Sequence, residues 1–258
     1  MRRTKKKISF FNDKKEKLWG VLTLPKALDT SAKWPALIIC HGFGQTKSQR
    51  KFVNLARALA KQGIASLGFD FSGHGQSEGS LEKLSIEKQA QELKAAYDKL
   101  LGDKRIDKNK IALLGHSLGA LVVCLSQAKY QIAKALVLLS PALHQKELVK
   151  QWYSKEEIGL WKKQGYLDTP KGRLDLNYLN EAVSRDWSEV IKDIDPPTLI
   201  AHGEKDKDIP LKYSRDLFEK LKVKKKLDII AAADHHFESK EARQKLIELC
   251  LNWLKQNL

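Results

Sequence analysis

The sequence is poor in cysteine. Only three cysteines occur in 258 residues, at Cys40, Cys124 and Cys250, and each lies inside an apolar stretch. An odd number of isolated cysteines with no regular spacing indicates buried thiols in a reducing compartment and not a disulfide framework. No cysteine or histidine pair has the spacing of a zinc site, so we expect no bound metal.

Long hydrophobic runs are also absent. No apolar run approaches the ~20 residues that a membrane-spanning helix needs. The basic N-terminal stretch opens like a signal peptide, but its apolar patch is confined to residues 8–11. The apolar core of a signal peptide needs ~7–15 residues. We therefore expect no transmembrane segment and a cytoplasmic location.

Positive charge is plentiful, with a formal net charge of +16. The lysines are scattered over the chain and do not gather on one helix with interleaved aromatic residues, so we expect no nucleic-acid partner. Attraction of anionic substrates remains open. The segment 42–48 contains Gly42, Gly44 and Lys47 but does not have the spacing of a phosphate-binding loop. No dinucleotide fingerprint occurs elsewhere, and we expect no cofactor.

Apolar runs typical of buried strands alternate with stretches of helical spacing. This alternation predicts an α/β fold with a mostly parallel sheet that helices cover on both faces. An N-terminal antiparallel hairpin (residues 6–11 and 18–24) and a polar connection (26–33) precede the alternation. The expected strands are 35–40, 64–71, 111–114, 133–139, 197–201 and 226–231. The expected helices are 46–62, one from residue 85, one from residue 120, 211–221 and 240–256.

The alternation is interrupted between about residues 141 and 195. This segment is rich in charge and in aromatic residues, and it contains two short stretches with strand character around 170–172. It is too short for a domain of its own. We interpret residues 1–258 as one domain with an inserted cap at about 141–195. The aromatic side chains either contact substrate or form the core of the cap: Trp152, Tyr153, Trp161, Tyr166, Tyr178 and Trp187.

The stretch Lys110–Gly119, KIALLGHSLG, has the spacing G-x-S-x-G between a strand-like run and a helix-like run. This is the pattern of a nucleophile elbow, in which a serine sits on a sharp turn above the sheet. Gly115 and Gly119 remove the Cβ atoms that such a turn cannot accommodate. Ser117 is therefore a candidate nucleophile, although a five-residue pattern also arises by chance, with a serine that only caps a helix.

Other strand ends carry unusual residues as well. They are the segments 41–44, 203–206 and 234–236, which supply glycines, acids and histidines. Ligands of open parallel sheets bind beyond the carboxyl ends of the strands. A serine, an acid and a histidine thus follow one another in the chain order of the α/β-hydrolases.

Over nearly its whole length the chain resembles an α/β-hydrolase of the serine esterase type. The resemblance rests on five motifs in order: HG at 41–42, DFSGHGQSEG at 70–79, GHSLG at 115–119, HGEKD at 202–206 and DHHF at 234–237. A cap of about this size with a hairpin is similar to that of bacterial cinnamoyl and feruloyl esterases. The resemblance implies a sheet of about eight strands and hydrolysis of small acyl or aromatic esters through an acyl-serine.

The resemblance also assigns roles within these motifs. It implies Ser117 as nucleophile, His235 as base and Asp206 as the acid that orients His235. It selects His235 over the neighbouring His236, and Asp206 over Glu204 and Asp208. The backbone amides of Phe43 and Leu118 would form the oxyanion hole. His41 and His74 would brace the glycine loops, and His116 has no assigned role.

Alternatives remain at this point. A monoacylglycerol lipase, a thioesterase, an acyltransferase or a serine peptidase would use the same three residues. A binding protein that kept the fold without catalysis belongs to a different class. The sequence leaves the oligomeric state open.

Overall fold

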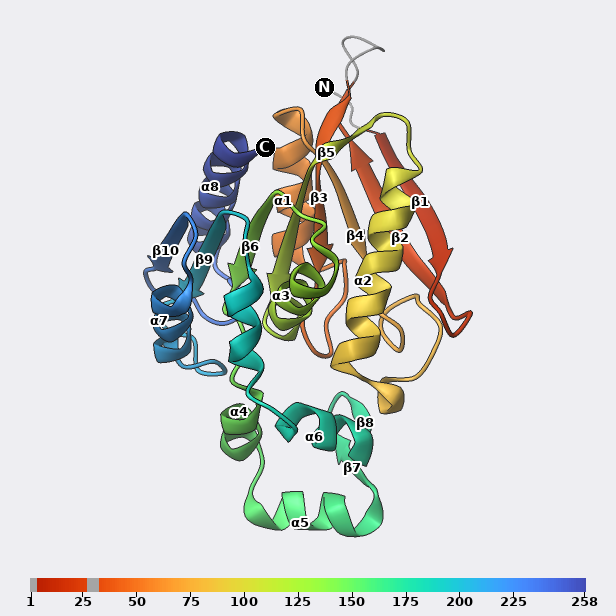
Figure 1. Cartoon of the computed structure of the whole chain (residues 1–258), viewed down its shortest axis with the longest axis vertical. Coiled ribbons are helices and arrows are strands. Elements are labelled where there is room, and N and C mark those ends of the chain that lie inside the picture. Colours follow the sequence, from red (N-terminus) through yellow and green to blue (C-terminus); the bar gives the residue numbers. More distant parts are fainter. Residues whose placement is uncertain (1–3, 27–32) are drawn as a thin grey trace.

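A computed structural model describes residues 4–26 and 33–258, so most of the expected polar connection at 26–33 lies outside the described residues. The fold is a twisted sheet between two layers of helices, with further helices beyond one end of the sheet (Figure 1). No helix within the described ranges is both long and apolar enough to cross a membrane.

The sheet has eight strands in the order β1-β2-β4-β3-β5-β6-β9-β10. β1 and β2 form the expected antiparallel hairpin, β2 pairs antiparallel with β4, and every other neighbouring pair is parallel. The prediction of an α/β fold with a mostly parallel sheet is therefore confirmed. The strands are β1 Thr4–Phe11, β2 Lys17–Leu24, β3 Trp34–Cys40, β4 Ala65–Phe69, β5 Ile106–His116, β6 Ala135–Leu139, β9 Thr198–Gly203 and β10 Lys225–Ile230.

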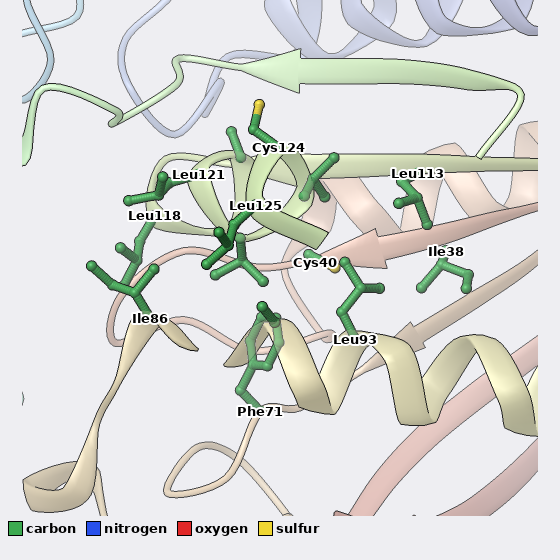
Figure 2. Packing of buried hydrophobic residues seen from close by; sticks show 14 of the residues in the cluster. Ile38, Cys40, Phe71, Ile86, Leu93, Leu113, Leu118, Leu121, Cys124 and Leu125 are labelled. Carbon is green, nitrogen blue, oxygen red and sulfur yellow. The ribbon is translucent and has the colours of Figure 1, made fainter. Parts of the chain in front are cut away.

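Helices cover both faces of this sheet because its central strands carry apolar side chains on both faces. Leu37 and Leu114 belong to the cluster formed with α1 and α8 on one face. Ile38 and Leu113 belong to the cluster formed with α2 and α3 on the other face. Figure 2 shows this second cluster, in which Leu93 and side chains of α3 pack together. The helices are α1 Arg50–Lys61, α2 Ile86–Leu101, α3 Leu118–Tyr130, α7 Leu211–Lys220 and α8 Lys240–Asn257.

Helix α1 begins at Arg50, four residues later than the sequence pattern predicted. Residues 46–49 instead form a turn, in which the Gln49 amide donates to the Thr46 carbonyl. The amide of Lys47 donates to the buried Asp70 carboxylate at 2.8 Å, and the Lys47 ammonium pairs with the same carboxylate. These contacts hold residues 46–49 in a turn ahead of the helix, and apolar spacing alone does not reveal them.

The inserted segment between β6 and β9, which we call the cap, lies below the sheet in Figure 1 except for η2 (Trp187–Asp193), which packs beside the sheet against α3 and α7. It consists of α4 Gln145–Trp152, α5 Lys155–Gln164, the hairpin β7 Tyr166–Thr169 and β8 Gly172–Asp175, α6 Leu176–Val183, and the 3₁₀ helix η2 Trp187–Asp193. A second 3₁₀ helix, η1 Leu81–Lys83, precedes α2 and contacts β8. The cap hairpin predicted around residues 170–172 is thus present.

A carboxylate of the cap joins it to the core. Glu181 on α6 accepts hydrogen bonds from the Ser85 hydroxyl at 3.0 Å and from the amides of Ile86 and Glu87 at 2.8 and 2.9 Å. These amides belong to the first turn of α2, whose groups have no acceptor within the helix. A negative charge is favoured there, so the contact stabilises both the helix end and the seating of the cap.

Candidate active site

Ser117 lies at the junction of β5 and α3 with a φ of +55°. Residues other than glycine rarely adopt this backbone conformation, and they keep it only where the surrounding structure imposes it. A Cβ on Gly115 would lie 2.2 Å from the Gly119 carbonyl oxygen, and one on Gly119 would lie 2.5 Å from the His41 carbonyl oxygen. The two glycines therefore allow the strand and the helix to approach closely enough for the sharp turn.

Asp206 and His235 are paired. The His235 Nδ1–H donates to Asp206 Oδ2 at 2.7 Å, and both side chains are almost completely buried. The other carboxylate oxygen, Oδ1, accepts from the amides of Asp208 and Ile209 at 3.0 and 2.9 Å. Glu204, in contrast, accepts from the Ala232 amide. Because Nδ1 carries the proton, Nε2 of His235 keeps the lone pair that a base requires.

The pKa of Asp206 reflects opposing influences. Burial raises it, but the hydrogen bond and charge of His235 and the amide of Ile209 together hold the pKa below its usual value. The carboxylate therefore stays ionised and able to stabilise a positively charged His235.

His202, to which the sequence pattern assigns no role, fixes the loop that carries Asp206. The His202 Nε2–H donates to the Ile209 carbonyl at 2.9 Å, and Nδ1 accepts from the Ser214 hydroxyl at 2.7 Å. Burial lowers the pKa of His202, so the ring is neutral and has one proton to donate. Its contact closes the turn around Asp206.

Ser117 and His235 line one pocket with a volume of about 260 Å³. Phe43 and Leu118, whose amides are the candidate oxyanion donors, line the same pocket. Among residues 4–26 and 33–258, neither amide has a hydrogen-bond acceptor. Two peptide N–H groups are thus available beside the candidate nucleophile, as stabilisation of an oxyanion requires.

Two buried histidines brace the loop that contains Phe43. The His41 Nδ1–H donates to the Gly42 carbonyl at 2.8 Å, and Nε2 accepts from the Phe71 amide at 3.1 Å. His74 accepts from the Gly44 amide at 3.3 Å and donates to the Ser72 carbonyl at 3.0 Å. The bracing role that the resemblance implied for both residues agrees with these bonds.

His116 has more contacts than its place in the elbow indicated. Its Nε2 lies 2.8 Å from the His235 carbonyl oxygen, and its Nδ1 lies 3.1 Å from the Gln45 amide. The Gln45 amide in turn lies 3.0 Å from Nδ1 of His236. No sequence signal points to Gln45, because these contacts join segments that are 71 and 191 residues apart.

Three histidines lie close enough to hold a metal ion. Ring nitrogens of His116, His235 and His236 all lie within 4.8 Å of one another. The spacing rule for zinc sites overlooks this group, because it considers only residues that are close in sequence. Hydrogen bonds already engage Nδ1 of all three rings and Nε2 of His116. A metal would therefore have to displace these bonds.

The cap forms one wall of the pocket. Three of its aromatic side chains, Trp152, Tyr153 and Tyr178, line the pocket together with Leu174 and Lys171. Trp161 and Trp187 are instead buried, with 0% and 1% of their surfaces exposed. Trp161 and Trp187 therefore belong to the core, as one of the two sequence interpretations expected. Trp152, Tyr153 and Tyr178 line the pocket, and their contact with substrate stays a prediction.

The sheet order, the elbow and the cap define an α/β hydrolase. The family model described as "Serine aminopeptidase, S33" matches residues 32–192, well over half of the chain. The chain therefore belongs to this hydrolase family.

Solved structures and curated relatives agree with this class. Est1E from Butyrivibrio proteoclasticus, solved with ferulic acid bound, superposes with a TM-score of 0.83 at 28% identity and covers 96% of this chain and 99% of its own. The rat mitochondrial palmitoyl-protein thioesterase ABHD10 is 24% identical, over 84% of this chain and 74% of its own length. The similarity to bacterial feruloyl esterases that the sequence indicated is confirmed.

A mycobacterial relative is longer than this chain. The uncharacterized protein Rv2307c of Mycobacterium tuberculosis is 29% identical over 78% of this chain, but the match covers only 63% of that protein. The chain thus spans less than two thirds of the length of this relative.

Proposed function

We propose that the protein is a serine esterase that hydrolyses small acyl or aromatic carboxylic esters through an acyl-serine intermediate. The observation that carries the proposal is the paired Asp206 and His235 at a pocket that also contains Ser117 on its strained turn. A serine hydroxyl is barely ionised at neutral pH and needs a neighbouring base. His235, with its free Nε2, supplies that base.

In the first stage, the Ser117 hydroxyl oxygen attacks the ester carbonyl carbon while Nε2 of His235 takes the hydroxyl proton. The carbonyl oxygen becomes an oxyanion, which the amides of Phe43 and Leu118 stabilise. Asp206 stabilises the imidazolium through its hydrogen bond to Nδ1. When the C–O bond to the alcohol breaks, His235 returns the proton to the departing oxygen, and the acyl group remains on Ser117.

In the second stage, a water molecule replaces the alcohol. His235 takes a proton from the water as its oxygen attacks the acyl carbon, and the same two amides stabilise the second oxyanion. The bond from the carbon to the Ser117 oxygen then breaks. The serine recovers its proton, and the carboxylic acid leaves. The residues that take part are all protein groups, and the scheme uses no cofactor.

The pocket favours a compact, partly aromatic acyl or alcohol group. Its volume of about 260 Å³ is small for a ligand site, and cap residues Trp152, Tyr153 and Tyr178 provide flat apolar surfaces. Ferulic acid, the ligand of Est1E, has this character. We therefore propose hydroxycinnamate-type or short-chain esters as substrates. The three free, buried cysteines support the cytoplasm as the proposed location.

Other acyl-transfer reactions on the same residues are the second candidate. The description of the family model names an aminopeptidase, and ABHD10 is a thioesterase. A panel of nitrophenyl butyrate, methyl ferulate, a palmitoyl thioester, a monoacylglycerol and an amino-acyl amide separates the possibilities. The proposal predicts the highest kcat/KM on one of the first two esters, and hydrolysis of amides alone would contradict it.

A binding protein without catalysis is the remaining alternative. It predicts that Ser117→Ala leaves ligand binding unchanged and that the wild-type protein hydrolyses no member of the panel. Turnover that the same substitution abolishes rules it out.

A further inference from the structure

We infer that Gln45 is a positioning residue for His235: its amide connects the loop before α1 to His116 and His236 and thereby holds the main chain that carries the base. The inference rests on the proposed esterase function for its kinetic consequences, but its structural content is independent of the substrate. It concerns two loops and the end of β5, which are far apart in sequence and meet at the Gln45 amide.

The contacts are short, and those of His116 are buried, whereas His236 at the other end is exposed. Gln45 is 6% exposed and His116 is fully buried. The Gln45 side chain lies 3.1 Å from Nδ1 of His116 and 3.0 Å from Nδ1 of His236. His116 Nε2 lies 2.8 Å from the carbonyl oxygen of His235. A continuous chain of contacts thus runs from His236 through Gln45 and His116 to His235.

The directions of these hydrogen bonds follow from the protonation of His116. Burial, and after it the charges of Lys51 and His235, lower the pKa of His116 well below its usual value, so the ring is neutral and has one N–H. The His235 carbonyl can only accept, so this proton must lie on Nε2. Nδ1 of His116 is then an acceptor, and the group of Gln45 that faces it must be the NH₂.

The orientation of the Gln45 amide is therefore fixed. The structure places Oε1 of Gln45 at Nδ1 of His116 and Nε2 of Gln45 at Nδ1 of His236. We assign the turned-over orientation, in which the NH₂ donates to Nδ1 of His116 and the carbonyl oxygen accepts from the Nδ1–H of His236. The opposite orientation would place the only proton of His116 on Nδ1 and turn the Nε2 lone pair toward the His235 carbonyl oxygen. Turning the amide over exchanges only its nitrogen and oxygen and keeps both contacts at the same lengths.

The chain of bonds acts on the part of His235 that Asp206 does not hold. Asp206 fixes the imidazole through Nδ1, whereas His116 fixes the backbone carbonyl of the same residue. The two rings also pack against each other, with centroids 4.6 Å apart and an interplanar angle of 43°. Lys51 donates to the next carbonyl along the chain, that of His236, at 3.4 Å. Without Gln45, the NH₂ that keeps His116 in its required tautomer is lost.

The test compares Gln45→Leu with Gln127→Leu in the full chain. Gln127 is also buried, and its amide bonds Asp195 and the amides of Ile132 and Ala133, outside the pocket. We expect Gln45→Leu to lower kcat about 10- to 100-fold with KM changed less than about threefold, because a small displacement of the base impairs chemistry more than binding. Gln127→Leu should lower the melting temperature and leave kcat of the folded protein unchanged.

Two further variants test the connection through His236. An asparagine at position 236 keeps an N–H donor near the place of the His236 Nδ1–H. We therefore expect a higher kcat for His236→Asn than for His236→Leu. The double variant Gln45→Leu/His236→Leu should have nearly the same kcat as Gln45→Leu alone, because both substitutions break the same chain of hydrogen bonds. Fully additive losses would contradict the inference.

A structural readout separates this inference from the proposed function. The proton on His235 Nδ1, bonded to Asp206, gives a downfield ¹H NMR signal, and we expect Gln45→Leu to shift or broaden it while Gln127→Leu does not. An unchanged signal with wild-type kcat overturns the inference. If Ser117→Ala retained hydrolysis, the proposed function would fail, but the response of the His235 signal would still decide the role of Gln45.

Discussion

The imidazole of His235 donates from Nδ1 to Oδ2 of Asp206 at a distance of 2.7 Å, which leaves Nε2 without a proton in the pocket that contains Ser117. This relationship fixes the tautomer of His235, the proposed base. In the proposed mechanism Asp206 is therefore the orienting acid, whereas Glu204 accepts from the Ala232 amide.

Replacement of Asp206 by asparagine should reduce kcat about 10³- to 10⁴-fold, because an amide NH₂ facing Nδ1 favours the wrong tautomer of His235. Glu204→Gln, in the same loop, should keep kcat within about threefold, since a neutral amide oxygen still accepts from Ala232. Steady-state kinetics on the best ester of the panel measures both variants. Equal losses in the two variants would indicate that the loop and not the His235 contact matters.

The close approach of the backbone of residues 40–41 to Gly119 should make an alanine at position 119 strongly destabilising. A Cβ at this position would lie 2.5 Å from the His41 carbonyl oxygen and 2.6 Å from that of Cys40. We expect Gly119→Ala to lower the free energy of unfolding by about 2 kcal/mol or more, since backbone must move. Gly159→Ala is the control: it lies in α5 with no atom within 4 Å of the added Cβ, and it should be neutral or stabilise by up to about 1 kcal/mol. Denaturant titration of both variants measures the difference.

Acid should destabilise the protein through His41. Burial, and then the neighbouring His74, lower the pKa of His41 to about 3 in the folded state, whereas the unfolded chain has a histidine pKa near ~6.5. Between these values the unfolded state binds more protons, so stability falls as the pH decreases below about 6.5, by up to ~1.4 kcal/mol per pH unit. The His41→Gln variant lacks this titrating group. The difference in unfolding free energy between the wild type and the variant should therefore shrink from pH 7 to pH 5. A difference in unfolding free energy that stays constant from pH 7 to pH 5 would contradict the lowered pKa of His41.

Glu181 should determine how firmly the cap is seated on α2. Its carboxylate accepts from the Ser85 hydroxyl and from two amides of the first turn of α2. Glu181→Ala should cost about 1–2 kcal/mol of unfolding free energy, the range for loss of an N-terminal helix cap, and should speed proteolysis within the cap. Glu248→Ala removes an exposed pair with Lys245 and should change stability by less than about 0.5 kcal/mol. Similar proteolysis of the two variants would show that this contact does not hold the cap.

Local sequence signals predicted much of the fold. Parallel strands buried on both faces appear as continuous apolar runs, and the glycines around Ser117 mark the tight turn that the structure contains. Glycines are informative in this way because a close backbone approach excludes all other residues. The candidate site residues also follow strand ends, which topology alone brings together.

Contacts between distant segments were not predictable in this way. The bonds of His116 to Gln45 and to the His235 carbonyl join loops that no periodicity relates. The start of α1 was placed too early because residues 46–49 form a turn that contacts Asp70, which apolar spacing does not show. The cap aromatics were divided between pocket and core by packing, which composition does not encode.

The central claim, that Ser117 forms a covalent acyl intermediate, is tested most directly by labelling with a fluorophosphonate followed by mass spectrometry. The labelled protein should gain the mass of one phosphonyl group on the peptide that carries Ser117, with parallel loss of esterase activity. Ser117→Ala, folded as judged by circular dichroism, should be neither labelled nor active. A folded wild-type protein that stays unlabelled, or a Ser117→Ala variant that still turns over esters, would contradict the account.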